Sequence, residues 1–207
     1  MGVLIKLSIM RPGKAMDLIK PMLTKPSFTA KEARGLGVHP ALLNYYVKTG
    51  ELEQVRRGVY RHPGAPESSE IQWADLVNSV LSIPGGAICL ISALAVYDLT
   101  EEIPRHHWIA VSHDTSAKAQ YPIKIVRYRN ADLGKTQIEI GGVQVQIYDR
   151  ERTIIDAFRR LSRETAIKAL KFALKKGGKE KIDLVKLQKY AKKLRTPIEP
   201  YLLAVTT

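Results

Sequence analysis

The sequence predicts an α+β protein in which an N-terminal winged helix-turn-helix precedes a mixed α/β domain that ends in basic helices. Three observations support this fold class. Short, well-punctuated helical segments and a basic hairpin occupy residues 10–63. Alternating apolar segments typical of strands follow, and Lys- and Arg-rich helical segments end the chain. Two domains are therefore expected, at 10–63 and 68–207, joined by the Pro-rich stretch HPGAPESSE.

The charge of the chain points toward nucleic acid. Its 207 residues carry a net charge of +13, and 45% of them are hydrophobic, enough to build a core. An excess of Lys and Arg attracts phosphate groups and gains affinity by releasing counterions. Charge alone leaves one alternative, a solvated basic surface without a ligand.

Cysteine content and hydropathy limit the other possibilities. Cys89 is the single cysteine, so an intramolecular disulfide and a CxxC metal site are excluded, and a buried structural thiol is expected. Its apolar stretch, AICLISALAV, is shorter than the roughly 20 residues that span a bilayer. The first residues lack the features of a secretory signal, which predicts a cytoplasmic protein without a membrane partner. Met10 is an alternative start.

The sequence predicts three short helices in the N-terminal region. The first is expected from about Lys14 to Leu23, interrupted by Pro21. Thr29 and Glu32 form a capping box that begins the second helix, which Gly37 ends. The third helix begins at Pro40 and ends before Gly50. Two strands follow, at 52–55 and 59–61, joined by the basic turn Arg56-Arg57-Gly58.

The third helix has the two faces that a recognition helix needs. Leu42, Leu43, Tyr46 and Val47 form a side to bury, and the opposite side is suited to the major groove. Asn44 is chemically suited to adenine, and Lys48 to phosphate or guanine. His39 either meets a phosphate or simply caps the helix. The hairpin either contacts the DNA backbone or minor groove or is merely solvated. The DNA-binding candidates are His39, Ala41, Asn44, Tyr45, Lys48, Arg56, Arg57 and Arg61.

The second domain is expected to mix strands and helices. A helix spans 71–81, a short strand and helix follow from Ala87, and strands are predicted at HWIAVS, IKIVRY and IEIGGVQVQIY, with a turn at Gly141-Gly142. Asp149 caps a helix in which Arg152 and Asp156, four residues apart, form a structural ion pair. Two further helices follow, one reaching Gly177 and one starting at Asp183 with Leu184, Leu187, Ala191 and Leu194 as its apolar stripe.

The C-terminal helices carry a strongly basic stretch. It either tracks DNA phosphates, binds an acidic face of a partner, protects an RNA substrate, or is a solvated helix face. Its residues are Arg159, Arg160, Arg163, Lys168, Lys171, Lys175, Lys176 and Lys179.

Three stretches resemble AbiEi-type antitoxins of bacterial abortive-infection (type IV) toxin-antitoxin operons. They are FTAKEARGLGVHPALLNYYVKTGELEQVRRGVYR, LISALAVYDLTEEIPRHHWIAV and VQIYDRERTIIDAF, and the GEL…RRGVY ending of the first is the most telling. The resemblance covers most of residues 14–174 loosely. It implies a cytoplasmic protein whose N-terminal domain binds operator DNA and represses its own operon, and whose C-terminal domain counters a nucleotidyltransferase-like toxin. Related chains without a toxin imply a second possibility, a stand-alone regulator.

Two other classes of function are alternatives to DNA binding: a nucleic-acid-processing enzyme and a protein-interaction module. A nucleic-acid-processing enzyme needs carboxylates or histidines around a metal, and the chain has no (Asp/Glu)-x-Lys pair, no GxxxxGK[ST] and no GxSxG. The neighbours His106 and His107 are predicted to point to opposite faces of a strand. No catalytic residue, metal or cofactor is therefore predicted. A pure protein-interaction module would expose an apolar helix face. The chain is expected to be a monomer or a weak dimer.

Overall fold

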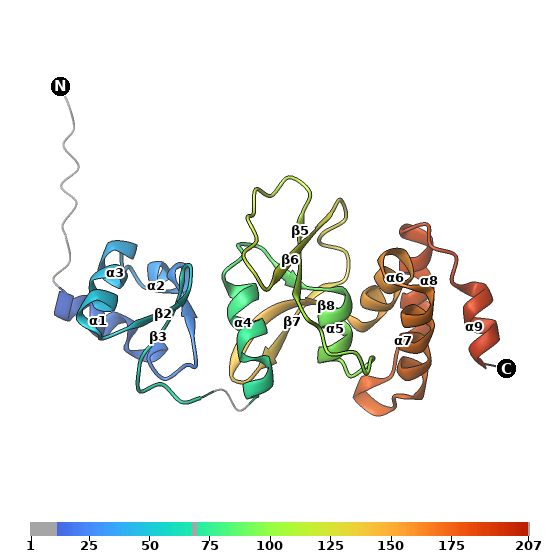
Figure 1. Ribbon diagram of the computed structural model, residues 1–207, viewed down its shortest axis with the longest axis horizontal. Coiled ribbons are helices and arrows are strands. Elements are labelled where there is room, and N and C mark those ends of the chain that lie inside the picture. Colours follow the sequence, from blue (N-terminus) through green and yellow to red (C-terminus); the bar gives the residue numbers. More distant parts are fainter. Residues whose placement is uncertain (1–11, 68–69, 207) are drawn as a thin grey trace, which may run out of the picture. The chain divides into compact units, whose positions relative to one another are not determined.

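The computed structural model describes residues 12–67 and 70–206, which form two compact units (Figure 1). The first unit contains the described residues up to Ser82 together with Glu139–Val143. The second contains Ile83–Ile138 and the residues from Gln144 onward. Helices and strands occur in both, which confirms the α+β class. The expected domain starts at residues 10 and 68, and the alternative start at Met10, lie outside the described residues.

Residues 12–61 of the first unit combine three α-helices with a three-stranded antiparallel sheet, and we call them the N-terminal module. The strand order is β1-β3-β2. β1 was not predicted, because two residues show no periodicity, but it pairs Phe28 with Tyr60 across the sheet. The elements are α1 Pro12–Ile19, η1 Lys20–Met22, β1 Phe28–Thr29, α2 Ala30–Gly35, α3 Pro40–Thr49, β2 Glu53–Arg56 and β3 Val59–Arg61.

The helix ends in the module follow the predicted signals. The Thr29 hydroxyl accepts the Glu32 N–H at 3.1 Å, and the Glu32 carboxylate accepts the Thr29 N–H at 2.7 Å. Both halves of the capping box are therefore formed at the start of α2. Gly37 and Gly50 have φ of +85° and +80°, the left-handed conformation that ends a helix most easily at glycine.

The module has its own hydrophobic core. Apolar side chains from all three helices and from the sheet meet there, so the module buries its apolar surface without the rest of the chain. The buried members of this core are Ala15, Ile19, Met22, Phe28, Ala33, Val38, Leu43, Tyr46, Leu52 and Tyr60.

The predicted helix at 71–81 begins as a 3₁₀ turn, η2 Ile71–Trp73, and continues as α4 Ala74–Leu81. Leu76, Val77 and Val80 on α4 are buried. The Glu70 carboxylate, just before the turn, accepts the N–H of Gly141 at 3.4 Å. This bond joins the start of the segment to the 139–143 hairpin tip within the first unit.

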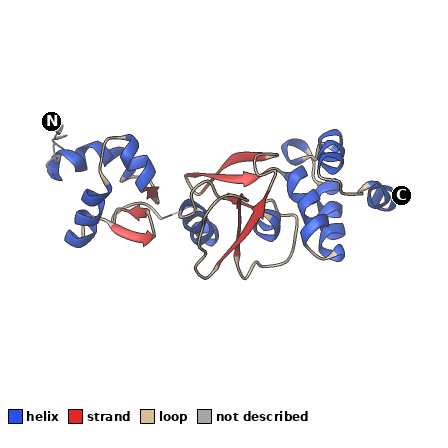
Figure 2. Cartoon of the chain, turned by 90° about the horizontal axis from the view of Figure 1, so that it is seen from above, coloured by secondary structure: helices blue, strands red, loops and turns tan. Residues whose placement is uncertain are grey.

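A five-stranded mixed sheet, in the order β6-β5-β4-β8-β7, is the centre of the second half of the chain (Figure 2). β5 pairs in parallel with β6 and antiparallel with β4, and β4 pairs in parallel with β8. Gly141 and Gly142, with φ of +56° and +82°, form the predicted turn between β7 and β8. The strands are β4 Ala87–Ile88, β5 His107–Ser112, β6 Ile123–Tyr128, β7 Lys135–Ile140 and β8 Val143–Tyr148.

The helices of the second unit include a group beyond one end of the sheet (Figures 1 and 2). Asp149, Ser162 and Asp183 cap three of them through their side chains. Leu184, expected in the apolar stripe, is 43% exposed because it lies in the first turn of its helix, ahead of the buried Leu187 and Ala191. The last helix was not predicted. The helices are α5 Leu90–Val96, α6 Arg150–Arg160, α7 Arg163–Lys175, η3 Gly178–Glu180, α8 Leu184–Lys193 and α9 Glu199–Thr206. Within the described residues, no helix has the length and apolar character to cross a membrane.

Arg152 and Asp156 of α6 form the predicted ion pair, which is buried. Arg152 Nε donates to Asp156 Oδ2 at 2.8 Å, and both side chains are at most 1% exposed. The same guanidinium donates to the carbonyls of Asn130 and Leu133 at 3.0 and 2.7 Å. Hydrogen bonds to fixed partners are what make a buried charge tolerable.

Removing one partner of this pair should be costly. Asp156→Ala leaves the Arg152 charge buried without its carboxylate, so we expect the free energy of unfolding in urea to fall by about 3–5 kcal/mol. Arg152→Met combined with Asp156→Leu should lose less than Asp156→Ala alone, because no uncompensated charge is left. Glu164→Ala is the control: it removes the exposed ion pair between Glu164 and Lys168 on α7 and should leave the free energy of unfolding unchanged. A loss below about 1 kcal/mol for Asp156→Ala would contradict this role.

The capping box should make stability depend on pH. Burial raises the pKa of Glu32, but hydrogen bonds from the Thr29 N–H and Lys25 outweigh it, so the pKa lies below the ordinary 4.5. A lowered carboxyl pKa stabilises the folded state above the unfolded value and loses that contribution as pH falls through the folded value.

At neutral pH, Glu32→Gln should therefore unfold at a lower urea concentration than wild type. The difference between the two midpoints should close as pH falls below 4.5. Asp17→Asn, an exposed change on α1 of the same module, is the matched control and should leave the midpoint unchanged at every pH. A gap for Glu32→Gln that is constant with pH would refute the assignment.

Candidate nucleic-acid interface

Helix α3 divides into a buried and an exposed face. Leu43 and Tyr46 are buried in the module core, and Leu42 and Val47 are half-buried beside it. The Tyr46 hydroxyl donates to the Pro12 carbonyl, which ties α3 to the start of α1. The residues that face away from this core are all exposed: Ala41, Asn44, Tyr45 and Lys48.

The exposed face of α3 combines different chemistries. Asn44 has an amide that donates and accepts, and Lys48 is a cation one turn further along. The Tyr45 ring is 45% exposed and packs edge-on against Tyr46, with 5.7 Å between centroids. Three side chains of this kind on one helical face suit a polar, negatively charged surface.

His39 is the N-cap of α3. Its Nδ1 accepts the N–H of Ala41 at 3.2 Å, which is the capping role that the sequence left open. Nε2 has no partner among the residues that the structure describes, and the side chain is exposed. One ring nitrogen therefore remains available beside the positive end of the helix.

The turn between β2 and β3 is held against α2. The N–H of Ala30 donates to the carbonyl of Gly58 at 2.9 Å, which joins the turn to the first residue of α2. Gly58 has φ of +72°, a conformation that a side chain strains. Arg57 in this turn is exposed and Arg56 half-buried, and neither forms an ion pair within the described ranges.

Arg61, the third arginine of the hairpin, is already paired. Its Nε donates to Glu53 Oε2 at 2.6 Å across β2 and β3, whose registers place the two residues opposite each other. Both side chains are about half exposed, so the pair is solvent-screened. Arg61 therefore has an acidic partner within the hairpin, whereas Arg57 has none among the described residues.

Two further exposed cations lie on α2. Lys31 and Arg34 are three residues apart, a spacing that puts both on one helical face. Neither residue was predicted from the sequence as a DNA-binding candidate. Their i, i+3 spacing is the signal that identifies them. Residues 12–61 contain nine Lys and Arg against four Asp and Glu.

The basic residues of the C-terminal helices differ in whether they have an acidic or aromatic partner. Arg159 donates to Asp156 at 3.0 Å, and the Arg160 and Arg163 guanidinium groups lie over aromatic rings. Lys168 pairs with Glu164 at 2.7 Å, and Lys176 pairs with Asp98 at 2.6 Å. The exposed cations of this stretch without an ion pair in the described part of the chain are Lys171, Lys175 and Lys179.

Cys89, Asp98 and Glu102 are engaged within the structure, by burial or by side-chain partners. Within the described ranges, no three His, Cys, Asp or Glu side chains are placed to hold a metal. Cys89 is fully buried, as expected, and burial raises the pKa of its thiol. Glu102 accepts the Thr165 hydroxyl at 2.9 Å, and Asp98 pairs with Lys176.

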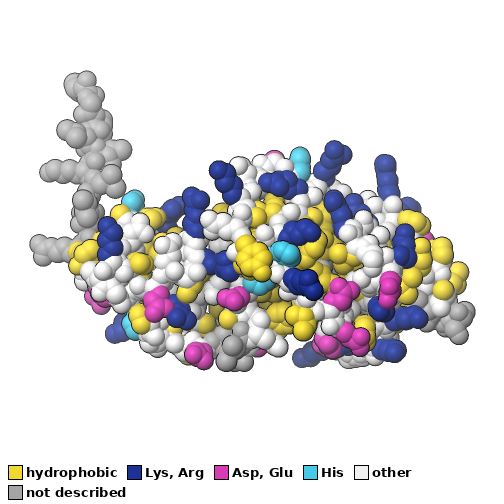
Figure 3. Space-filling view, viewed as in Figure 1, with side chains coloured by type: hydrophobic (Ala, Val, Ile, Leu, Met, Phe, Trp, Pro, Cys, Tyr) yellow, Lys and Arg dark blue, Asp and Glu magenta, His cyan; other side chains and the backbone are white. Residues whose placement is uncertain are grey.

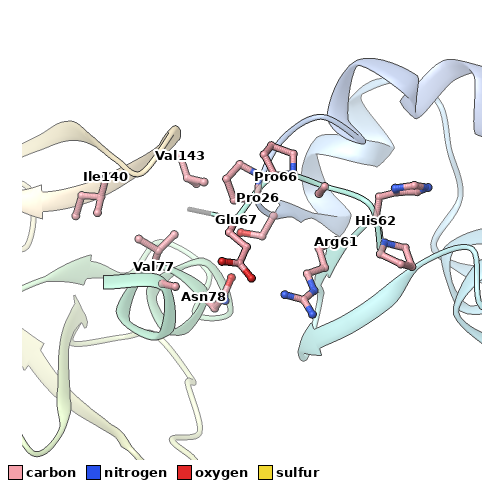
Figure 4. Close-up of a pocket in the computed structure, with 13 residues that line it drawn as sticks. Pro26, Arg61, His62, Pro66, Glu67, Val77, Asn78, Ile140 and Val143 are labelled. Atoms are coloured by element: carbon pink, nitrogen blue, oxygen red, sulfur yellow. The ribbon is translucent and has the colours of Figure 1, made fainter. Parts of the chain in front are cut away.

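A cavity of about 350 Å³ lies in the first unit (Figure 4). Proline, alanine and valine side chains supply much of its lining. Glu67 and Asn78 reach into it, and Asn78 Oδ1 is buried with no hydrogen-bond partner among the described residues. The cavity adjoins the hairpin through Arg61 and is separate from the exposed face of α3.

Comparison with known protein families gives a match to part of the N-terminal half of the chain. No curated protein matches the chain. Residues 24–63 match the family described as "Transcriptional regulator, AbiEi antitoxin". The matched residues contain β1, α2, α3, β2 and β3, which are the elements that carry the exposed α3 face and the Arg56-Arg57-Gly58 turn.

Proposed function

We propose that this protein is a sequence-specific double-stranded DNA-binding regulator whose N-terminal module is a winged helix-turn-helix that represses its own operon. One observation carries the proposal. The exposed face of α3, with Asn44 and Lys48, belongs to a segment that matches a transcriptional-regulator family. The order of helices, followed by a hairpin next to α3, suits a helix in the major groove with a wing beside it.

In this proposal α3 reads base edges. The Asn44 amide has the donor and acceptor needed to pair with adenine, and Lys48 suits guanine or phosphate. Ala41 near the N-terminus of the helix offers a small apolar contact for a thymine methyl group. Tyr45 adds an exposed ring and hydroxyl on the same face.

The remaining candidates position the module on the phosphate backbone. Arg56 and Arg57 enter the minor groove or contact phosphates from the wing, and the Ala30–Gly58 bond holds that wing in place. Lys31 and Arg34 add phosphate contacts from α2, the helix that crosses the backbone in such motifs. His39 meets a phosphate through Nε2 at the start of α3.

We also propose that the protein acts as an antitoxin, as the family description favours. In this proposal its target is a nucleotidyltransferase-like toxin in the cytoplasm. The unpaired Lys171, Lys175 and Lys179 are the surface that we assign to this role, for an acidic partner or its RNA. Co-expression with the neighbouring gene tests the proposal. Growth restored by wild type and by an Asn44→Ala variant supports it, and failure of wild type to restore growth identifies a stand-alone regulator.

Variants should separate base reading from backbone contact. Asn44→Ala should weaken binding to the upstream duplex by about 1–3 kcal/mol and leave binding to a scrambled duplex unchanged. Arg57→Ala should weaken both duplexes alike and reduce the salt slope by about 1, because it removes one phosphate contact. Fluorescence anisotropy with labelled duplexes across a salt series measures both effects.

Arg129→Ala is the matched control, since it removes an exposed arginine of the second unit and should change neither affinity nor salt slope. Equal losses on both duplexes for Asn44→Ala and Arg57→Ala would rule out this division of roles. Equal binding of wild type to both duplexes would rule out sequence-specific recognition.

A further inference from the structure

The second unit exposes an aromatic and basic surface that DNA binding by the N-terminal module does not use. Two large apolar side chains on it are almost fully in solvent, with Ile103 91% and Tyr121 83% exposed. Burial of these two side chains against a ligand would remove apolar area from water and so favour binding. We call this the Tyr121 surface; it comprises the paired rings of His106 and Tyr121, the exposed Lys124, and the exposed Ile103, Arg105 and Lys118, which lie within three residues of one of the two rings in the sequence.

The Tyr121 ring has an aromatic neighbour and is still largely exposed. His106 packs edge-on against it, with ring centroids 5.9 Å apart and an interplanar angle of 80°. The His107 N–H donates to the Pro122 carbonyl at 2.9 Å, so the two loops are joined next to these rings. The ring of Tyr121 therefore has an open face on which a flat partner can stack.

The surroundings of Tyr121 are positively charged. Arg105, Lys118 and Lys124 are all exposed, and Lys124 Nζ lies 4.0 Å from the centre of the Trp108 ring. Residues 103–108 and 115–124 contain no Asp or Glu; the acids next to them in the sequence are Glu101, Glu102 and Asp114, of which Glu102 accepts the Thr165 hydroxyl of α7. Figure 3 shows exposed hydrophobic side chains beside His, Lys and Arg over β5 and β6. A negatively charged ligand with flat, apolar faces is the complement of this surface.

We propose that the Tyr121 surface binds single-stranded nucleic acid. A base stacks on the free face of Tyr121, while Arg105, Lys118 and Lys124 contact the phosphates on either side. Unpaired strands are favoured over duplex because the faces of paired bases are already stacked within the helix. The proposal does not depend on DNA binding by the N-terminal module, since all six residues belong to the second unit.

The test is strand binding by the full-length chain. A fluorescein-labelled 20-nucleotide RNA of mixed sequence, and the DNA strand of the same sequence, are titrated by anisotropy at physiological salt. Wild type is expected to bind both strands, and tighter binding of RNA would identify a contact to the 2′-hydroxyl. Tyr121→Ala should weaken binding about 5- to 150-fold, the effect of losing one stacked base. Tyr121→Phe should retain binding.

Duplex binding is measured beside strand binding to separate the two surfaces. Tyr121→Ala should leave duplex affinity unchanged, whereas Arg57→Ala should weaken duplex binding and spare strand binding. Val185→Ala, which shortens a 77% exposed apolar side chain on α8 of the same unit, is the matched control for strand binding. Strand binding that Arg57→Ala weakens and Tyr121→Ala does not would overturn the proposal by placing the strand on the N-terminal module. Absence of strand binding by wild type would overturn it and indicate a protein partner for the Tyr121 surface.

Discussion

The buried charge of Arg152 constrains how the second unit is assembled. Its guanidinium lies in a place without solvent, so every contact it makes must be supplied by protein groups. Asp156 supplies the opposite charge, the 130–133 loop supplies two carbonyls, and the rings of Tyr128 and Tyr148 lie within 5.0 Å of the guanidinium carbon. One side chain thus joins α6 to the loop after β6 and to two strands.

Neighbouring residues depend on the same arrangement. Gly134 must lack a side chain, because a Cβ there would come within 2.7 Å of Arg152. Asp149 caps α6 and also accepts the Tyr190 hydroxyl and pairs with Lys186, which brings α8 against α6. The segment from Asp149 to Asp156 therefore orders the sheet end and the C-terminal helices. The residues of this segment have structural roles, so a functional site of the second unit is expected among its exposed residues.

Most of the fold was predictable because its signals are local. The capping box, Gly37, Gly50, the Gly141-Gly142 turn and the i, i+4 ion pair each act within a few residues. β1 and the parallel pairing of β5 with β6 depend on distant partners, so no local pattern predicted them.

Less of the candidate interfaces was predictable. The exposed face of α3 follows from helical spacing, but the pairing of Arg61 with Glu53 depends on strand register. The Tyr121 surface brings together loops 15 residues apart, and exposure cannot be read from an isolated tyrosine. The basic C-terminal stretch was predicted as one surface, yet aromatic and acidic partners engage most of its members.

Hydrogen–deuterium exchange of the full-length chain, with and without its upstream duplex, tests the central claim most directly. Binding should slow exchange of amides in the α3 helix and the β2–β3 hairpin and leave residues 103–124 unchanged, because the duplex contacts only the N-terminal module. Slowed exchange confined to residues 103–124 or to α7, with none in α3, would contradict the account.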